Sequence, residues 1–187
     1  MNFDNNDLKT VKILIVDDHD DIHEDFKLIF SSVYHLKNEL DELLEDILDE
    51  PGTQSLSENY KFKIDSAYQG KEALQLVESA IQNGIPYSVI FMDVRMPPGW
   101  NGVETIRQIW KNYPETNIVL CTAYSDFSWE EIIQTLGYSH HLLILKKPYD
   151  RLEVIQQALS LIIKSEEINN YKKRIAELEQ ELEKHRS

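Results

Sequence analysis

YSVIFMDVRMPPGWNG, residues 87–102, is the stretch of sequence that decides the fold. Residues 87–93 predict a strand whose apolar side chains leave no polar face, which is typical of a parallel sheet covered on both sides. The strand ends at Asp93, and the chain breaks at once into Pro-Pro-Gly at residues 97–99. Ligands of parallel sheets bind beyond the carboxyl ends of the strands, so Asp93 stands where a ligand would bind. Taken alone, such an aspartate is equally typical of a turn cap.

Strands and helices alternate along the rest of the chain. Four more apolar runs predict strands, at residues 11–16, 60–67, 117–121 and 142–145. Apolar residues at helical spacing predict five helices, at residues 22–49, 70–82, 103–110, 129–136 and from 154 onward. Alternation of this kind predicts an α/β fold, a doubly wound parallel sheet of five strands with helices on both faces.

The last predicted helix has no break after residue 162. Apolar residues continue at spacings of three and four among many charges, at Ile168, Tyr171, Ile175, Leu178 and Leu182. This pattern predicts a short coiled-coil seam, through which the chain could form a homodimer. A solvent-exposed, charged helical tail is the alternative.

The composition narrows the classes of function. Net charge is −14, from 33 acidic and 19 basic residues, so direct binding to nucleic acid or to an anionic membrane is not expected. No apolar run approaches the roughly 20 residues of a membrane span, and residues 1–10 do not resemble a signal peptide. The single cysteine, Cys121, excludes a disulfide framework. We therefore expect a soluble, cytoplasmic protein without membrane insertion.

Chemically useful residues stand at the ends of the predicted strands. They are Asp17, Asp18, Asp93, Thr122 and either Lys146 or Lys147. In a parallel sheet these ends share one edge, so the side chains can meet in one crevice. Clustered carboxylates repel unless a cation lies between them, and Mg²⁺ is the expected cation. A lysine and a threonine hydroxyl suit phosphoryl oxygens, and Asp93 then suits a nucleophile that becomes an acyl phosphate.

Together these residues resemble the receiver domain of two-component response regulators. The resemblance covers residues 11 to about 163 and rests on Asp17-Asp18, Asp93 with Pro97, Thr122-Ala123 and Lys147-Pro148. It implies a flavodoxin-like sheet with strand order 2-1-3-4-5. It also implies a signalling domain that is not a stand-alone enzyme.

The resemblance further implies roles for individual residues. Asp93 would accept a phosphoryl group from a sensor histidine kinase or a phosphotransfer protein. Asp18, Asp93 and the backbone carbonyl of Arg95 resemble direct Mg²⁺ ligands, and Asp17 would reach the ion through water. Lys147 matches the lysine of the family because it precedes Pro148.

Thr122 resembles the switch hydroxyl of the family, but the aromatic residue that accompanies it is replaced by Ile144. The usual coupling between this hydroxyl and a rotating ring is therefore in doubt. The segments PPGWNGVETI, CTAYSDFSWEEI and LLILKKPYD resemble a receiver subgroup found in larger signalling proteins, ahead of catalytic output domains.

The chain also departs from the family in length. We expect an N-terminal tail at residues 1–10, a receiver domain at 11–163 with an acidic helical insertion at 31–59, and a C-terminal coiled-coil or linker helix at 164–187. The insertion is either a solvated decoration or a partner surface.

Two other functions remain as alternatives. One is a receiver-like scaffold without phosphotransfer. The other is an aspartyl-nucleophile phosphohydrolase, but such enzymes usually carry a second acid two residues after the nucleophile, and here that residue is Arg95. His19 and His23 lie near the acidic pair, and we expect them to be exposed residues at a helix start rather than metal ligands.

Overall fold

The computed structural model describes residues 9–45, 60–123 and 128–186. Its elements in chain order are β1 (Lys9–Val16), α1 (Asp20–Glu45), β2 (Tyr60–Ala67), α2 (Gly70–Gln82), β3 (Val89–Asp93), α3 (Gly102–Asn112), β4 (Ile118–Thr122), α4 (Trp129–Leu136), β5 (Leu142–Lys146) and α5 (Arg151–Arg186). The predicted end of the first helix at residue 49, most of the expected N-terminal tail and residues 46–59 of the expected insertion lie outside the described residues.

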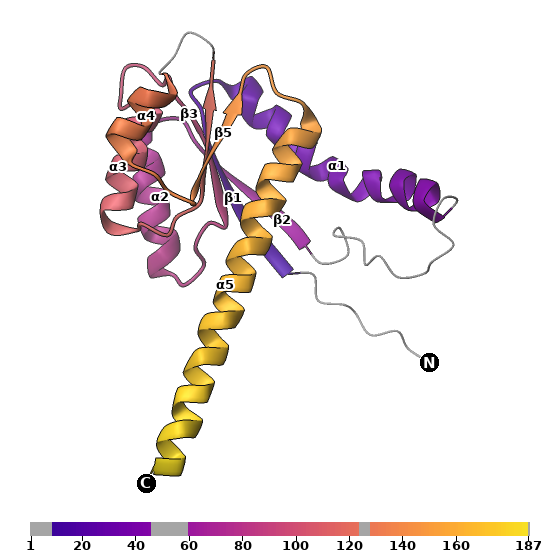
Figure 1. The fold of residues 1–187 in the computed structure, drawn as a ribbon. Coiled ribbons are helices and arrows are strands. Elements are labelled where there is room, and N and C mark those ends of the chain that lie inside the picture. The colour runs from indigo at the N-terminus through magenta and orange to yellow at the C-terminus, as the bar shows by residue number, and fades with distance from the viewer. Residues whose placement is uncertain (1–8, 46–59, 124–127, 187) are drawn as a thin grey trace.

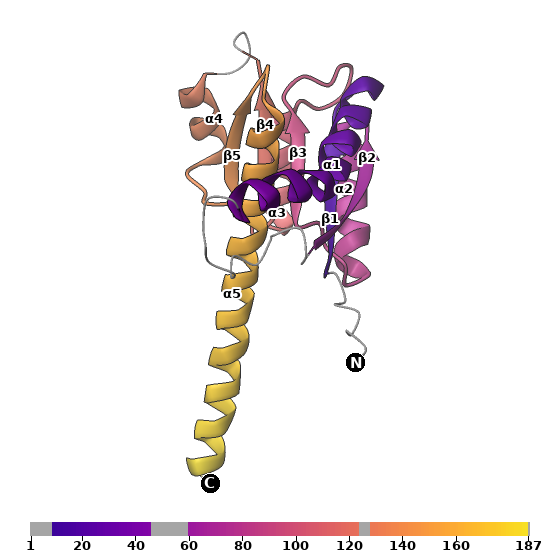
Figure 2. The same cartoon turned by 90° about the vertical axis from the view of Figure 1, so that its right-hand side faces the viewer.

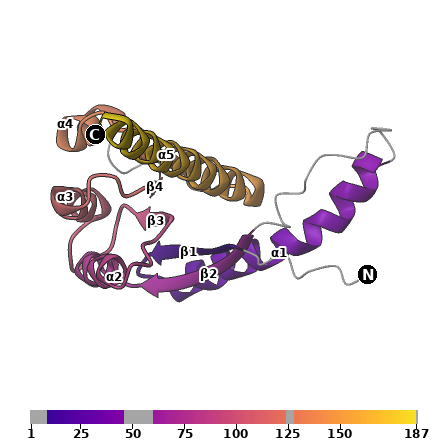
Figure 3. The same ribbon diagram turned by 90° about the horizontal axis from the view of Figure 1, so that it is seen from below.

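The five strands form one parallel sheet in the order β2-β1-β3-β4-β5, which confirms the predicted flavodoxin-like fold. Helices α2, α3 and α4 cover one face of the sheet, and α1 and α5 cover the other (Figures 1 and 3). In the pairing of β3 with β4, Asp93 lies opposite Cys121, and in the pairing of β4 with β5, Thr122 lies opposite Lys146. The register therefore brings the polar strand ends to one edge.

Each face of the sheet packs into its own hydrophobic core. On the side of α2, α3 and α4 the buried residues include Leu14, Ile90, Met92, Ile106, Ile109 and Leu120. On the side of α1 and α5 they include Phe26, Phe30, Phe91, Val154, Ala158 and Leu161. Residues 89–93 are buried without exception, so β3 supplies side chains to both cores. This explains why its sequence shows no polar face.

Four of the five strands differ from the sequence prediction by one or two residues at an end. β4 is Ile118–Thr122 rather than 117–121, and β5 ends at Lys146 rather than at residue 145. β1 begins at Lys9, two residues early, because Lys9 and Thr10 pair in register with Tyr60 and Lys61 while their own side chains stay exposed. A hydrophobic pattern cannot predict strand residues whose side chains are polar and exposed. β3 begins at Val89 rather than Tyr87.

Helix α5 is 36 residues long, and its second half extends well past the sheet (Figures 1 and 2). Three hydrogen bonds hold it where it leaves the domain. Tyr60 donates to Glu166 (3.0 Å), Asn117 Nδ2 donates to Ser165 Oγ (2.7 Å), and Lys164 donates to the carbonyl of His140 (2.9 Å). Within the described part of the chain, none of the helices combines the length and apolar character that crossing a membrane requires.

We predict that docking of α1 depends on Phe26. Its side chain is 1% exposed, and its ring lies 4.8 Å from that of Phe91. Phe26→Ala should lower the free energy of unfolding by about 3–5 kcal/mol, because it removes buried ring contacts and leaves a cavity. Urea denaturation followed by circular dichroism measures this. Leu28→Ala, on the same helix but 66% exposed, is the matched control. Equal losses in the two variants would contradict the packing of α1 described here.

Candidate functional site

Asp93 ends β3 with its side chain only 11% exposed. Its Oδ2 accepts a hydrogen bond of 2.7 Å from the backbone N–H of Arg95, so the residue does cap the turn that follows it. The turn closes when Gly102 N–H donates to the carbonyl of Val94 (2.9 Å). A Cβ at position 102 would collide with the carbonyl oxygen of Asp93, so this close approach requires glycine. One oxygen of Asp93, Oδ1, is left for other partners.

That oxygen is bound by Lys147. The ammonium Nζ lies 2.6 Å from Asp93 Oδ1 and 3.0 Å from Asp17 Oδ2. One cation therefore joins groups from the ends of β5, β3 and β1, which stand up to 130 positions apart in the sequence. The backbone N–H of Lys147 donates to the carbonyl of Thr122 (2.8 Å), which fixes the lysine to the end of β4. Lys146 is exposed and lines the cavity beside Thr122.

Burial and charge oppose each other in this group. Burial raises the pKa of Asp93 above its ordinary value, and the hydrogen bond from Lys147 offsets only part of this rise. For Lys147, burial disfavours the charged form, but the hydrogen bonds to Asp93 and Asp17 outweigh burial and raise the pKa of the ammonium. The lysine therefore keeps its charge, and its ammonium offsets part of the cost of burying the Asp93 carboxylate.

Asp17, Asp18 and His19 form a second cluster beside this pair. One ligand atom from each lies within 4.8 Å of the others. The backbone N–H of His19 donates to Asp17 Oδ1 (3.0 Å), and His19 Nδ1 lies 2.9 Å from Asp18 Oδ1. That Asp18 oxygen is buried and takes part in no hydrogen bond. Carboxylate oxygens with free lone pairs are donors that Mg²⁺ prefers, so the residues fit this ion.

The expectation that His23 is exposed was wrong. Its side chain is 1% exposed, and Nε2 donates a hydrogen bond of 2.8 Å to the carbonyl of Asp17. The ring also packs against Tyr68, with centroids 4.5 Å apart. The signal was present in the sequence, since His23 shares helical spacing with Phe26 and Phe30 on the buried face of α1. His19, by contrast, is largely exposed, with 73% of its side chain accessible.

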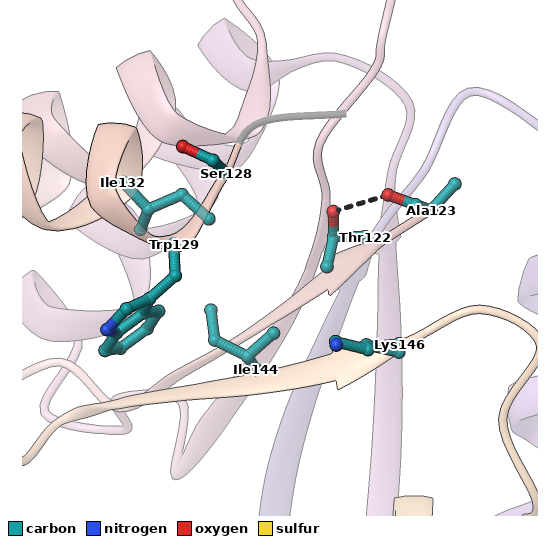
Figure 4. Close-up of a pocket in the computed structure, with 7 residues that line it drawn as sticks. All are labelled: Thr122, Ala123, Ser128, Trp129, Ile132, Ile144 and Lys146. Carbon is teal, nitrogen blue, oxygen red and sulfur yellow. Dashed lines mark hydrogen bonds between the residues drawn. The ribbon is translucent and has the colours of Figure 1, made fainter. Parts of the chain in front are cut away.

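Thr122 stands at the end of β4 beside a cavity of about 530 Å³ (Figure 4). The walls are formed by Thr122, Ala123, Ser128, Trp129, Ile132, Ile144 and Lys146. Trp129 and Ile132 face Ile144 from α4, and the Thr122 hydroxyl donates to the carbonyl of Ala123 (3.2 Å). Ile144, where the family resemblance expects an aromatic ring, thus forms one wall of an apolar hollow. Trp129, which is 49% exposed, is the ring among the described residues that lines this hollow.

The fold brings most of the predicted site residues together. Asp17, Asp93 and Lys147 are in direct contact, Asp18 adjoins Asp17, and Thr122 is joined to Lys147 through the backbone. For Arg95 the structure places the N–H against Asp93. Its carbonyl as a metal ligand, like the catalytic and metal-binding roles of the other residues, stays a prediction.

Comparison with known proteins gives the family. The profile of the response regulator receiver domain matches residues 46–160, which is more than half of the chain. The chain therefore belongs to the response regulator receiver domain family. The match begins after α1, so Asp17 and Asp18 lie outside it. Their place in the site rests on the structure, where β1 pairs with β2 and β3.

Individual relatives are more distant. The chain is 28% identical over 99 residues to the uncharacterized transcriptional regulatory protein YesN of Bacillus subtilis, a match that spans 53% of this chain but only 26% of that protein. A response regulator receiver domain protein from Clostridium thermocellum has a TM-score of 0.59 at 17% identity, with 84% of this chain and 98% of that chain covered. A structure described as adenylate cyclase from Rhodopirellula baltica has a TM-score of 0.55 at 21% identity, covering 90% and 98%. These structural matches show the shared fold.

We predict that Lys147 stabilises the fold by holding the two carboxylates. Lys147→Met should lower the free energy of unfolding by about 1.5–3 kcal/mol, the range for hydrogen bonds to charged groups. The loss should grow as pH rises from 4 to 7. Without the ammonium the folded pKa of Asp93 lies further above its unfolded value, and such a group loses stability as it ionises.

Urea denaturation in EDTA across this pH range measures the effect. Lys146→Met is the matched control, since Lys146 is exposed and lines the cavity beside Thr122, whereas Lys147 is the lysine that binds both carboxylates. Equal and pH-independent losses in the two variants would contradict the prediction.

Proposed function

We propose that this receiver domain is a phosphoacceptor, modified on Asp93 by a sensor histidine kinase or a phosphotransfer protein. The contact of Lys147 with both Asp17 and Asp93 is the observation that carries the proposal. It sets a fixed positive charge beside a partly accessible carboxylate at the edge of the sheet where ligands of this fold bind. Phosphoryl transfer is catalysed mainly by such positioning and charge neutralisation.

The proposed step is a displacement at phosphorus. A carboxylate oxygen of Asp93 forms the new O–P bond while the P–N bond of the phosphohistidine breaks. The electron pair of that bond leaves on the imidazole, which takes up a proton from solvent. Lys147 begins 2.6 Å from Asp93 Oδ1 and offers its ammonium to the incoming phosphoryl oxygens. The phosphoryl group is thereby held on Asp93, and the transfer consumes no further reactant.

Mg²⁺ is the proposed cofactor. Asp18, Asp93 and the carbonyl of Arg95 would hold the ion directly, with Asp17 reaching it through water. When bound, Mg²⁺ neutralises charge on the phosphoryl oxygens. The buried Asp18 oxygen that accepts no hydrogen bond supports this assignment, because a divalent cation would satisfy it. The hydrogen bond from His23 to the Asp17 carbonyl supports the assignment too, because it fixes the backbone of Asp17.

Two elements next to the site are suited to report its state. Thr122 borders the hollow under Trp129, so movement of its hydroxyl toward a phosphate would alter that wall. Helix α5 starts four residues after Lys147 and runs to the opposite end of the domain, toward an output module or a second copy of the chain. We also propose a cytoplasmic location, which the lone buried Cys121 supports.

The two alternatives differ from this proposal in what Asp93 does. A scaffold would not be phosphorylated, although Asp93, Lys147 and the acidic pair are all in place. A phosphohydrolase would turn over an external ester, but the residue two after Asp93 is Arg95, which supplies no carboxyl for general acid catalysis.

We predict that acetyl phosphate with Mg²⁺ adds one phosphoryl group to the chain, seen as an adduct by intact mass spectrometry. Asp93→Asn should abolish the adduct, because an amide is not a nucleophile at neutral pH. Asp18→Asn should greatly slow its formation. Asp21→Asn, an exposed position at the start of α1, is the control and should behave as wild type.

Binding of beryllofluoride serves as a second probe in case this small donor reacts slowly. If neither forms a complex that depends on Asp93, the phosphoacceptor proposal is wrong and the scaffold is favoured. Sustained turnover of a phosphate ester would favour the hydrolase instead.

We further predict that Trp129 reports occupancy of the site. Beryllofluoride with Mg²⁺ should shift the tryptophan emission of the wild type, because Thr122 and Trp129 line the same cavity. Trp129→Phe should remove most of the shift. Trp110→Phe is the control, since its indole donates to the carbonyl of Thr116, away from this cavity, and should leave the shift unchanged. The opposite pattern would show that the hollow does not sense the site.

A further inference from the structure

Helix α5 carries large apolar side chains where no part of its own domain covers them. Tyr171 is 70% exposed, Ile175 56%, Leu178 42% and Leu182 65%. They are spaced by four, three and four residues, which places them on one stripe of the helix. Among the residues whose side-chain exposure is described, no other helix face carries four such residues in series. Water contact along the whole stripe is unfavourable, and a partner helix would remove it.

We infer that this stripe is the seam of a parallel, in-register two-stranded coiled coil formed with a second copy of this chain. The inference rests on the proposed function only for the role of α5, which is to pass the state of the site to a second copy of the chain. The spacing assigns Ile175 and Leu182 to position a of the heptad and Tyr171 and Leu178 to position d. Ile175 at a with Leu178 at d is the combination that favours two parallel strands.

Charge complementarity specifies the partner. In a parallel pair, each residue at position g faces the residue at position e five places later on the other helix. Glu167 of one helix would face Lys172 of the other, and Arg174 would face Glu179. Each of these pairs joins opposite charges and is attractive. A second copy therefore presents the charges that this seam requires. Lys172 now bonds Glu115 of its own domain at 2.9 Å, but both side chains are more than half exposed, so exchanging partners costs little.

The domain prepares this helix for pairing. Forming the first turn of a helix is the costly step in water. Here α5 is nucleated on the sheet and held at its exit by the hydrogen bonds of Ser165 to Asn117 and of Glu166 to Tyr60. The stripe begins directly beyond these contacts and projects away from the domain (Figures 1 and 2). Dimerisation therefore requires only that two helices that are already formed associate.

The same contacts disfavour an antiparallel pair. Placing Ile175 opposite Leu178 of an antiparallel copy would bring the C-terminal end of α5 beside residues 164–168 of that copy. Lys164, Ser165 and Glu166 are already bonded to their own domain there. The parallel arrangement avoids that region and sets two Asp93 sites at the same end of the assembly.

Sedimentation equilibrium of the unphosphorylated full chain in EDTA tests the seam. We expect a dimer whose dissociation constant rises by about tenfold or more in Ile175→Glu and Leu178→Glu, which bury a charge in the interface. Lys173→Glu, exposed and on the outer face of the same turn, is the matched control and should dimerise as wild type. A monomer at high concentration, a trimer, or loss of the dimer in the control alone would overturn the inference.

A charge exchange tests the direction of the helices. Arg174→Glu should weaken the dimer, and adding Glu179→Arg should restore it if the pair is parallel. In an antiparallel pair Arg174 faces Glu181 of the other copy, so Glu181→Arg would restore the dimer instead and overturn the inference. Because no phosphate is involved, these outcomes are independent of the phosphorylation of Asp93. Circular dichroism of each variant shows that the fold is kept.

Discussion

The double contact of Lys147 with Asp93 and Asp17 is the interaction on which the site depends. Two carboxylates held near each other with little access to water repel, and burial together with the charge of Asp17 raises the pKa of Asp93. The ammonium can offset this repulsion only because β5 ends at the same edge of the sheet as β3 and β1. Strand register, the tight approach of Gly102 and the His23 contact behind Asp17 all serve to keep that geometry.

The same lysine links the site to the longest element of the protein. Four residues after Lys147 the chain enters α5, which crosses one face of the sheet and leaves the domain at the opposite edge. Contacts with Tyr60 and Asn117 hold it there, so its free half continues in a fixed direction rather than on a flexible linker. A helix anchored in this way is a suitable path from a chemical event to a distant partner.

The sequence predicted the fold well because a doubly wound sheet is encoded locally. Each buried strand is a short apolar run, each helix shows a 3.6-residue period, and their alternation leaves few topologies open. One error fell where the local pattern carries no information. Lys9 and Thr10 join β1 through backbone pairing alone, with exposed side chains. The prediction for His23 was wrong for another reason: its position beside the acidic pair indicated an exposed site, whereas its spacing with Phe26 and Phe30 indicates the buried face of α1.

The sequence by itself determined which groups stand at the strand ends, since residue type and strand length are local properties. Only the tertiary structure decided how those groups meet. The place of Lys147 before Pro148 had already favoured it over Lys146, but only the structure shows its ammonium against Asp93, since one of two adjacent lysines faces that side. The tertiary structure also made Asp93 both a turn cap and an acceptor for Lys147, through different oxygens. These outcomes depend on distances between segments far apart in the chain, which no local pattern contains.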